Sequence, residues 1–224
     1  MVKAVIFDLD NTVYDYDFCH QKAMETLSRY CEEKYMLSRH GFEKKYGLAK
    51  ELVKSRLGDT GASHNRMLYM QTFLELIGRK PVTGALVLYD IYWDTMLETM
   101  EPFGQIFPLM EALRKRNIKI AVLTDLTAHI QHRKIIRLGL AEYVDALVTS
   151  EEAGQEKPGR KMFDLMLEKL ALEPHEAIMV GDSHEKDILG ARKAGMHGIL
   201  CSAENRDGLM EKCLEMIENE GQVG

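Results

Sequence analysis

The sequence is short of long hydrophobic runs, cysteine and proline, and each shortage excludes a class of protein. No apolar stretch approaches the roughly 18 residues that a membrane helix needs, so we expect no membrane span. Five prolines and 17 glycines show no repeat, which excludes collagen, and a hydrophobic content of 46% excludes a disordered chain. The cysteines are few and form no CxxC pair, which favours reduced thiols and a cytoplasmic protein. They are Cys19, Cys31, Cys201 and Cys213.

An excess of basic residues is also absent. Lys and Arg number 29 against 35 Asp and Glu, which gives a formal net charge of 29 − 35 = −6. This balance argues against a nucleic-acid partner, which favours basic patches. It leaves a small anionic substrate open, because such a substrate responds only to the local field. The 224 residues suffice for one or two domains with a large core.

Hydrophobic patterning divides the chain into two textures. Residues 2–7 form a short apolar run that meets Asp8 and Asp10 at once, which is typical of a buried strand rather than a signal peptide. Residues 16–100 carry apolar residues at helical spacing, with no convincing strand among them. We therefore predict an all-helical domain at 16–100, inserted after the first strand of a core built from 1–15 and 101–224.

Beyond the helical insert, short apolar strands alternate with helices. The expected strands cover 118–124, 143–150, 177–182 and 197–202, and the expected helices 106–116, 128–138, 160–171, 185–195 and 206–219. This alternation predicts βαβ units and therefore an α/β fold with a Rossmann-like parallel sheet. Ligands of such sheets bind at the carboxyl ends of the strands.

Carboxylates gather where the predicted strands end. Asp8 and Asp10 stand two residues apart after the first strand, so an extended backbone points both side chains to one side. Asp182 follows another strand. Three close carboxylates repel unless a cation lies between them, and Mg²⁺ prefers such oxygen ligands. The sequence therefore predicts a Mg²⁺ site at Asp8, Asp10 and Asp182.

Groups that can bind an anion lie at the same predicted edge. Thr124 ends a strand, the segment after it begins a helix whose N–H groups can bind an anion, and Lys157 offers a point charge for phosphate. A phosphate held there would lie against Asp8, which could attack it to form a phospho-aspartyl intermediate. Asp10 could then protonate the leaving oxygen and later activate water.

Four motifs in this order resemble those of the haloacid dehalogenase superfamily. They are DLDNT at Asp8–Thr12, the strand-ending Thr124, Lys157 within EKPGRKMF, and GDSHEKD from Gly181 to Asp187. The resemblance covers about 1–15 and 101–205, and it implies an HAD-like core with a helical C1 cap at 16–100 that selects substrates.

The resemblance also implies a role for each motif residue. Asp8 would be the nucleophile and a Mg²⁺ ligand, and Asp10 the general acid/base, with its backbone carbonyl on the metal. Asp182 would bind Mg²⁺, while Asp187 would support Lys157 or the water shell of the metal. Thr124 and Lys157 would hold the phosphoryl group.

Two positions refine this expectation. Family dehalogenases lack an acid at the position of Asp10, because their leaving group needs no proton, so Asp10 favours phosphate chemistry. Many members have Asn-Gly after the motif threonine, whereas this chain has Asp125-Leu126. The carboxylate adds negative charge near an anion site, and we expect only the backbone N–H of Asp125 to bind phosphate.

The function predicted from these residues is Mg²⁺-dependent hydrolysis of a small phosphorylated metabolite, such as a nucleotide or sugar phosphate. In the helical insert, Arg66 and His64 are candidate substrate contacts. The alternatives are a phosphotransferase or mutase of the same family, a phospho-aspartate signalling module and a non-catalytic binding member. The specific substrate and the oligomeric state, monomer or dimer, stay open.

Overall fold

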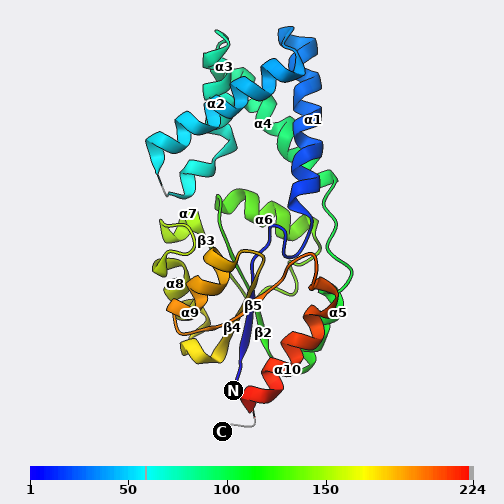
Figure 1. The fold of residues 1–224 in the computed structure, drawn as a ribbon, viewed down its shortest axis with the longest axis vertical. Helices are drawn as coiled ribbons and strands as arrows, with labels where there is room; N and C mark the ends of the chain where they lie inside the picture. The colour runs from blue at the N-terminus through cyan, green and yellow to red at the C-terminus, as the bar shows by residue number, and fades with distance from the viewer. Residues whose placement is uncertain (59, 222–224) are drawn as a thin grey trace. The chain divides into compact units, whose positions relative to one another are not determined.

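A computed structural model describes residues 1–58 and 60–221 and divides the chain into two compact units (Figure 1). The α/β unit contains the segment up to Asp15 and the segment from Glu101 onward. The helical unit spans Tyr16–Met100. The predicted fold class, α/β with a parallel sheet, is confirmed.

The α/β unit is built on a five-stranded sheet in which every described strand pairing is parallel. The strands are β1 (Ala4–Phe7), β2 (Lys119–Thr124), β3 (Ala146–Thr149), β4 (Ala177–Gly181) and β5 (His197–Leu200), in the spatial order β3-β2-β1-β4-β5. In this order β1 is central, and Phe7 lies beside Val122 of β2 and Val180 of β4. The residues that follow β1, β2 and β4 therefore emerge at one sheet edge.

Helices cover both faces of this sheet. They are α5 (Ile106–Lys115), α6 (Ala128–Arg137), α7 (Ser150–Ala153), α8 (Arg160–Leu170), α9 (Gly190–Lys193) and α10 (Leu209–Gly221). Figure 1 shows α8 and α9 on one side of the sheet, with α5 and α10 on the other. Alternate strand residues face opposite ways, so Ala4, Ile6 and Met179 join Phe163 of α8 and Ala191 of α9 in one buried cluster.

The described residues of the helical unit form four helices and a short 3₁₀ turn and no strand, as the helical spacing of this segment predicts. The helices are α1 (Tyr16–Tyr35), α2 (Arg39–Leu57), α3 (Arg66–Leu76) and α4 (Pro81–Glu98), and the turn covers Gly61–His64. Its own core is aromatic: Phe42 and Tyr46 of α2 contact Phe73, and Tyr46 also contacts Tyr69. The helical unit therefore has a hydrophobic core of its own.

Two predicted elements differ most from those observed. The strand expected at 143–150 covers only Ala146–Thr149. It begins late because the N–H groups of Tyr143 and Val144 bond the Leu140 carbonyl in a turn, and it ends where Thr149 caps α7 by accepting a hydrogen bond from the Glu152 N–H. The helix expected at 185–195 is divided into a π-helical turn, His184–Leu189, and α9. The π-helical turn and the cap of α7 each follow the carboxyl end of a strand, where side chains bond the backbone.

All four cysteines lie among the described residues, where they are buried and form no disulfide bond. Within the described residues, none of the helices combines the length and the apolar content that crossing a membrane requires.

We expect Phe163→Ala to destabilise the α/β unit. The Phe163 side chain is fully buried, and removing it leaves a cavity between α8 and the sheet, at a cost of about 3–5 kcal/mol. Urea unfolding followed by circular dichroism measures the change. Ile136→Ala is the control, because Ile136 is 67% exposed and its loss should cost less than about 0.5 kcal/mol. Equal effects of the two substitutions would contradict this packing.

Candidate active site

Asp8 leaves the central strand at the edge where the site forms. Its backbone N–H donates to the Val180 carbonyl of β4 at 2.9 Å, which continues the strand pairing to this residue. The chain then turns at once, because the Val13 N–H bonds the Leu9 carbonyl at 2.9 Å. The turn brings the Thr12 hydroxyl to 3.5 Å from Asp8 Oδ2. Asp8 is only 6% exposed, so its carboxylate needs partners inside the protein.

Lys157 supplies that partner and joins two motifs. Its Nζ donates to Asp8 Oδ1 at 2.5 Å and to Asp187 Oδ1 at 2.7 Å. Burial by itself lowers the pKa of Lys157, but the Asp8, Asp187 and Asp125 carboxylates outweigh it and raise that pKa above its ordinary value. Lys157 therefore remains a cation at neutral pH, held between Asp8 and Asp187.

The position of Asp187 follows from the π-helical turn after β4. The N–H groups of Asp187 and Ile188 both bond the Ser183 carbonyl, and the Ser183 N–H donates to Asp187 Oδ2 at 3.0 Å. The turn brings the Asp187 carboxylate against Gly181, where an added Cβ would overlap Asp187 Oδ2. Only glycine at 181 leaves room for this carboxylate.

The donor set at this edge fits a hard divalent cation. One carboxylate oxygen from each of Asp8, Asp182 and Asp187 lies within 4.8 Å of the others. Oxygen ligands in such a group suit Mg²⁺, which is held by one or two carboxylates and keeps several waters. Both Asp187 oxygens accept close hydrogen bonds, from Lys157 and from the Ser183 N–H, whereas Asp8 Oδ2 has only the 3.5 Å contact with the Thr12 hydroxyl. Asp8 and Asp182 are therefore the better candidates for direct ligands.

The pKa values of these acids reflect the same crowding. Burial raises the pKa of Asp8 well above its ordinary value, and the Asp187 and Asp10 charges add to the rise against the opposing effect of Lys157. Burial and Asp187 likewise raise the pKa of Asp182. A cation between the carboxylates would relieve this repulsion.

The Asp10 carboxylate lies in a different environment. Lys134 Nζ donates to its two oxygens at 2.7 and 3.0 Å, and the Tyr14 hydroxyl donates to Oδ1 at 2.6 Å. The Lys134 side chain is completely buried, although it comes from the distant helix α6. The carboxylate cluster of Asp8, Asp182 and Asp187 does not include Asp10.

Lys134 is not among the site residues predicted above, although the sequence carries a signal for it. Ile130, Gln131, Lys134 and Ile135 form the buried face of α6, so two polar residues stand on an apolar stripe. Gln131 is the second, and its Nε2 donates to Thr124 Oγ1 at 2.8 Å. A polar residue on the buried face of a helix must find a buried partner.

The Asp125-Leu126 departure also has a structural account. Asp125 Oδ1 accepts from the Lys157 backbone N–H at 3.0 Å, and Oδ2 pairs with Lys186 Nζ at 2.8 Å. Lys186 thereby offsets the negative charge of Asp125, which an asparagine at this position would not carry. Leu126 has a φ of 92°, a backbone region that favours glycine, and its N–H bonds Ser150 Oγ at 2.9 Å.

Arg66 and His64 lie in the helical unit. The Arg66 guanidinium donates to the His64 carbonyl at 2.8 Å and to the Tyr16 hydroxyl at 2.7 Å. This hydrogen bond from Arg66 therefore reaches the backbone carbonyl of His64 rather than its imidazole ring.

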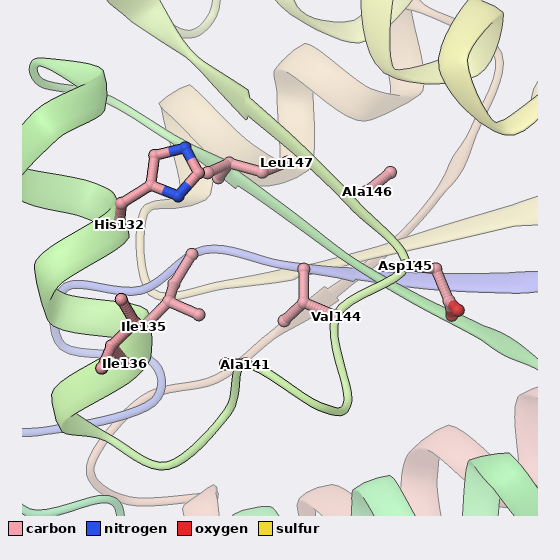
Figure 2. Close-up of a pocket in the computed structure, with 8 residues that line it drawn as sticks. All are labelled: His132, Ile135, Ile136, Ala141, Val144, Asp145, Ala146 and Leu147. Carbon is pink, nitrogen blue, oxygen red and sulfur yellow. The ribbon is translucent and has the colours of Figure 1, made fainter.

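A pocket elsewhere in the α/β unit contains none of the predicted site residues. It lies between α6 and the edge strand β3 (Figure 2), and most of its lining is apolar. Asp145 in that lining uses Oδ2 to accept from the Ile120 N–H at 2.8 Å, which ties its carboxylate to the sheet. The lining residues are His132, Ile135, Ile136, Ala141, Val144, Asp145, Ala146 and Leu147.

Comparison with known proteins identifies the family. The haloacid dehalogenase-like hydrolase profile matches residues 2–195, which is most of the chain. The chain belongs to this family. The predicted family, and with it the prediction of a hydrolase, is confirmed.

Individual relatives match over similar spans. Ribulose-1,5-bisphosphate 5-phosphatase of Halopiger xanaduensis is 43% identical over 202 residues, 89% of this chain and 84% of that protein. Glyceraldehyde 3-phosphate phosphatase of Methanopyrus kandleri is 34% identical over 200 residues, 88% and 82% of the two chains. A solved structure of a 2-haloacid dehalogenase from Pseudomonas syringae pv. Tomato has a TM-score of 0.69 and 25% identity, covering 89% of this chain and 86% of that one.

The carboxylate cluster predicts a pH-dependent stabilisation by Mg²⁺. Because the pKa values of Asp8 and Asp182 are raised, protons compete with the metal at a higher pH than they would at ordinary carboxylates. We expect Mg²⁺ to raise Tm at neutral pH and this increment to shrink as the pH falls toward the ordinary carboxylate range. Thermal denaturation with and without Mg²⁺ measures it.

The control for this experiment is Asp164→Asn, which removes an exposed carboxylate paired with Arg160 in α8. Asp8→Asn and Asp182→Asn should each remove most of the Mg²⁺ increment, whereas Asp164→Asn should keep it. An increment that persists in both site variants would place the metal elsewhere.

Proposed function

We propose that this chain is a Mg²⁺-dependent phosphatase of a phosphorylated sugar, acting through a phospho-aspartyl intermediate on Asp8. The observation that carries the proposal is the buried Asp8 carboxylate, paired with Lys157 at 2.5 Å, with carboxylate oxygens of Asp182 and Asp187 within 4.8 Å. Asp8 can act as a nucleophile, Lys157 lies beside it as a fixed positive charge, and the neighbouring acids can bind a metal cation. This combination suits attack on a phosphoryl group.

In the first step, an oxygen of Asp8 attacks phosphorus and forms an acyl phosphate, while the ester P–O bond breaks. Asp10 donates its proton to the departing alkoxide, which leaves as an alcohol. In the second step, Asp10 takes a proton from water as that water attacks the phosphorus. Inorganic phosphate leaves, and Asp8 is restored as a carboxylate.

The chain's own residues divide the remaining work. Lys157 favours the ionised form of Asp8 and offsets charge on the phosphoryl oxygens. Thr124, held by Gln131, and the backbone N–H of Asp125 supply further phosphate donors. Mg²⁺ bound by Asp8 and Asp182, with the Asp10 carbonyl as a further ligand, would supply positive charge at the transferring group. Lys134 and Tyr14 hold the Asp10 carboxylate in one orientation.

The two phosphatase relatives support the substrate class. One is named for a sugar bisphosphate and the other for a triose phosphate, and each matches more than four-fifths of this chain. Asp10 supports the same class of reaction, because an alkoxide leaving group needs a proton whereas a halide does not. We infer that the helical unit selects among phosphorylated sugars.

The proposal predicts how Asp10→Asn depends on the leaving group. Loss of the general acid should slow hydrolysis of an alkyl phosphate such as ribulose 5-phosphate by about 10²–10⁴-fold. The leaving group of p-nitrophenyl phosphate needs no proton. Phosphorylation of Asp8 by this substrate should therefore slow much less in the Asp10→Asn variant. Single-turnover release of alcohol or nitrophenol measures this step.

Asp8→Asn is the reference variant in this comparison, since losing the nucleophile should abolish release from both substrates. Equal slowing of the two substrates by Asp10→Asn would contradict the role of Asp10 as general acid. Absence of phosphate release by the native chain from any sugar phosphate, with Mg²⁺ present, would overturn the proposed function.

Lys134→Met tests whether Lys134 acts through Asp10. Without the lysine, the Asp10 carboxylate keeps only the Tyr14 hydroxyl of the two contacts described above. We expect kcat to fall by about 10–100-fold, with little change in KM, because misplacing a catalytic group by about 1 Å costs that much.

The double variant makes this test sharp. Lys134→Met combined with Asp10→Asn should be no slower than Asp10→Asn alone, because the lysine has nothing left to position. Multiplicative losses would show that Lys134 acts independently of Asp10. Lys161→Met, at an exposed lysine of α8, should leave kcat unchanged.

A further inference from the structure

The segment between β5 and α10 carries an arginine that reaches the first motif. Arg206 begins a short 3₁₀ turn, Arg206–Gly208, just before α10. Its Nη2 donates to the backbone carbonyl of Asn11 at 3.3 Å, across 195 positions of the sequence. Asn11 directly follows Asp10. The guanidinium therefore contacts the turn at residues 11–13, which we call the first-motif turn.

The geometry of the first-motif turn bears on Asp10 more than on Asp8. Asn11 has a φ of 61°, in the left-handed region that asparagine tolerates better than most residues, and the chain reverses there. The turn begins immediately after Asp10. Asp8, in contrast, is fixed by its strand pairing with β4 and by Lys157. A shift of the turn would therefore displace Asp10 first.

Arg206 also contacts the segment that lies beside this turn. The Phe103 N–H donates to the Val13 carbonyl at 2.8 Å, which joins residue 103 to the end of the turn. The guanidinium carbon of Arg206 lies 3.6 Å from the centre of the Phe103 ring. Stacking on an aromatic face fixes the plane of a guanidinium. Arg206 thus contacts the turn at the Asn11 carbonyl and its neighbour at the Phe103 ring.

The backbone that carries Arg206 is itself anchored to the sheet edge. The Asn205 side chain accepts from the Ser202 N–H at 2.8 Å and donates to the carbonyl of Leu200, the last residue of β5, at 3.1 Å. Gln105 Nε2 donates to the Arg206 carbonyl at 3.1 Å. Because its own backbone is held in this way, Arg206 can restrain the first-motif turn rather than move with it.

The position of this guanidinium has a cost. Arg206 Nε is buried and makes no hydrogen bond, and a buried donor without a partner is unfavourable. Attaching the terminal segment to the fold would not require this donor to leave water. Arg206 also lies beyond the residues 2–195 that the family profile matches, so membership of the family assigns it no role.

We propose that Arg206 is a positioning residue for Asp10. It holds the first-motif turn through the Asn11 carbonyl, so that Asp10 can deliver its proton to the leaving group. This inference rests on the proposed function, because it adds a residue to the proton-transfer step of that reaction. Arg206 contacts neither the substrate nor the Asp10 carboxylate and acts through the backbone.

Arg206→Met tests the proposal with the two substrates that differ in their need for a proton. We expect release of ribulose from ribulose 5-phosphate to slow about tenfold in a single turnover, because small displacements of a catalytic group are costly. Release of nitrophenol from p-nitrophenyl phosphate should change less than about twofold, because that leaving group needs no proton. KM for both substrates should stay near the native value.

Arg114→Met is the matched control. The Arg114 guanidinium carbon lies 4.7 Å from the centre of the Tyr143 ring, and Nη2 donates to the Glu142 carbonyl. It therefore makes the same two kinds of contact at a place that contains no predicted site residue, and both rates should stay unchanged. Arg206→Lys keeps a cationic donor for the Asn11 carbonyl and should recover part of the lost rate with ribulose 5-phosphate.

A double variant separates positioning from a merely structural role. Arg206→Met combined with Asp10→Asn should be no slower on ribulose 5-phosphate than Asp10→Asn alone, because no general acid is left to position. Multiplicative losses, or equal slowing of the two substrates by Arg206→Met, would overturn the proposal. If Arg206→Met does not fold, Phe103→Leu decides: it removes the stacking face and should slow only ribulose 5-phosphate, whereas equal rates on the two substrates would overturn the proposal.

The failure of this inference differs from the failure of the proposed function. Phosphate release by the native chain, with slowing by Asp10→Asn but none by Arg206→Met, would sustain the phosphatase and reject the role of Arg206. Absence of phosphate release by the native chain from any sugar phosphate would overturn both.

Discussion

The site depends on the two ion pairs of Lys157. Its ammonium group joins Asp8, after the central strand, to Asp187, after the neighbouring strand β4. All three side chains are almost wholly buried, so loss of the lysine would leave carboxylates without compensation in a place where water cannot replace it. The π-helical turn, the glycine at 181 and the parallel register all bring these three groups to one point.

A second lysine gives the two acids of the first motif different surroundings. Lys157 contacts Asp8 beside the other carboxylates, whereas Lys134 and Tyr14 hold Asp10 apart from them. Two carboxylates with distinct partners can take distinct roles, one as nucleophile and one as proton carrier. Separate partners also explain why two carboxylates only two positions apart need not bind one cation together.

Much of this arrangement could be predicted from the sequence, for a physical reason. Parallel strands bring their carboxyl ends to one edge, so acids that follow short apolar runs must lie near each other, as Asp8 and Asp182 do. Lys134 was missed because a helical lysine is usually solvated, and only the apolar neighbours on its face indicate burial. The partners of Asp125 and Arg66 come from distant segments, which local patterns do not specify. The carboxyl end of β3 was not predicted at the right residue, because it is set by the Thr149 side chain, which caps α7.

The central claim is that Asp8 becomes covalently phosphorylated, and trapping the acyl phosphate tests it most directly. Native protein turning over a sugar phosphate with Mg²⁺ is quenched in acid and reduced with borohydride, which converts an aspartyl phosphate into homoserine. Peptide mass spectrometry then locates the change. We expect homoserine at position 8, and only when substrate is present. Phosphate release with no change at position 8, or with homoserine at another acid, would contradict it.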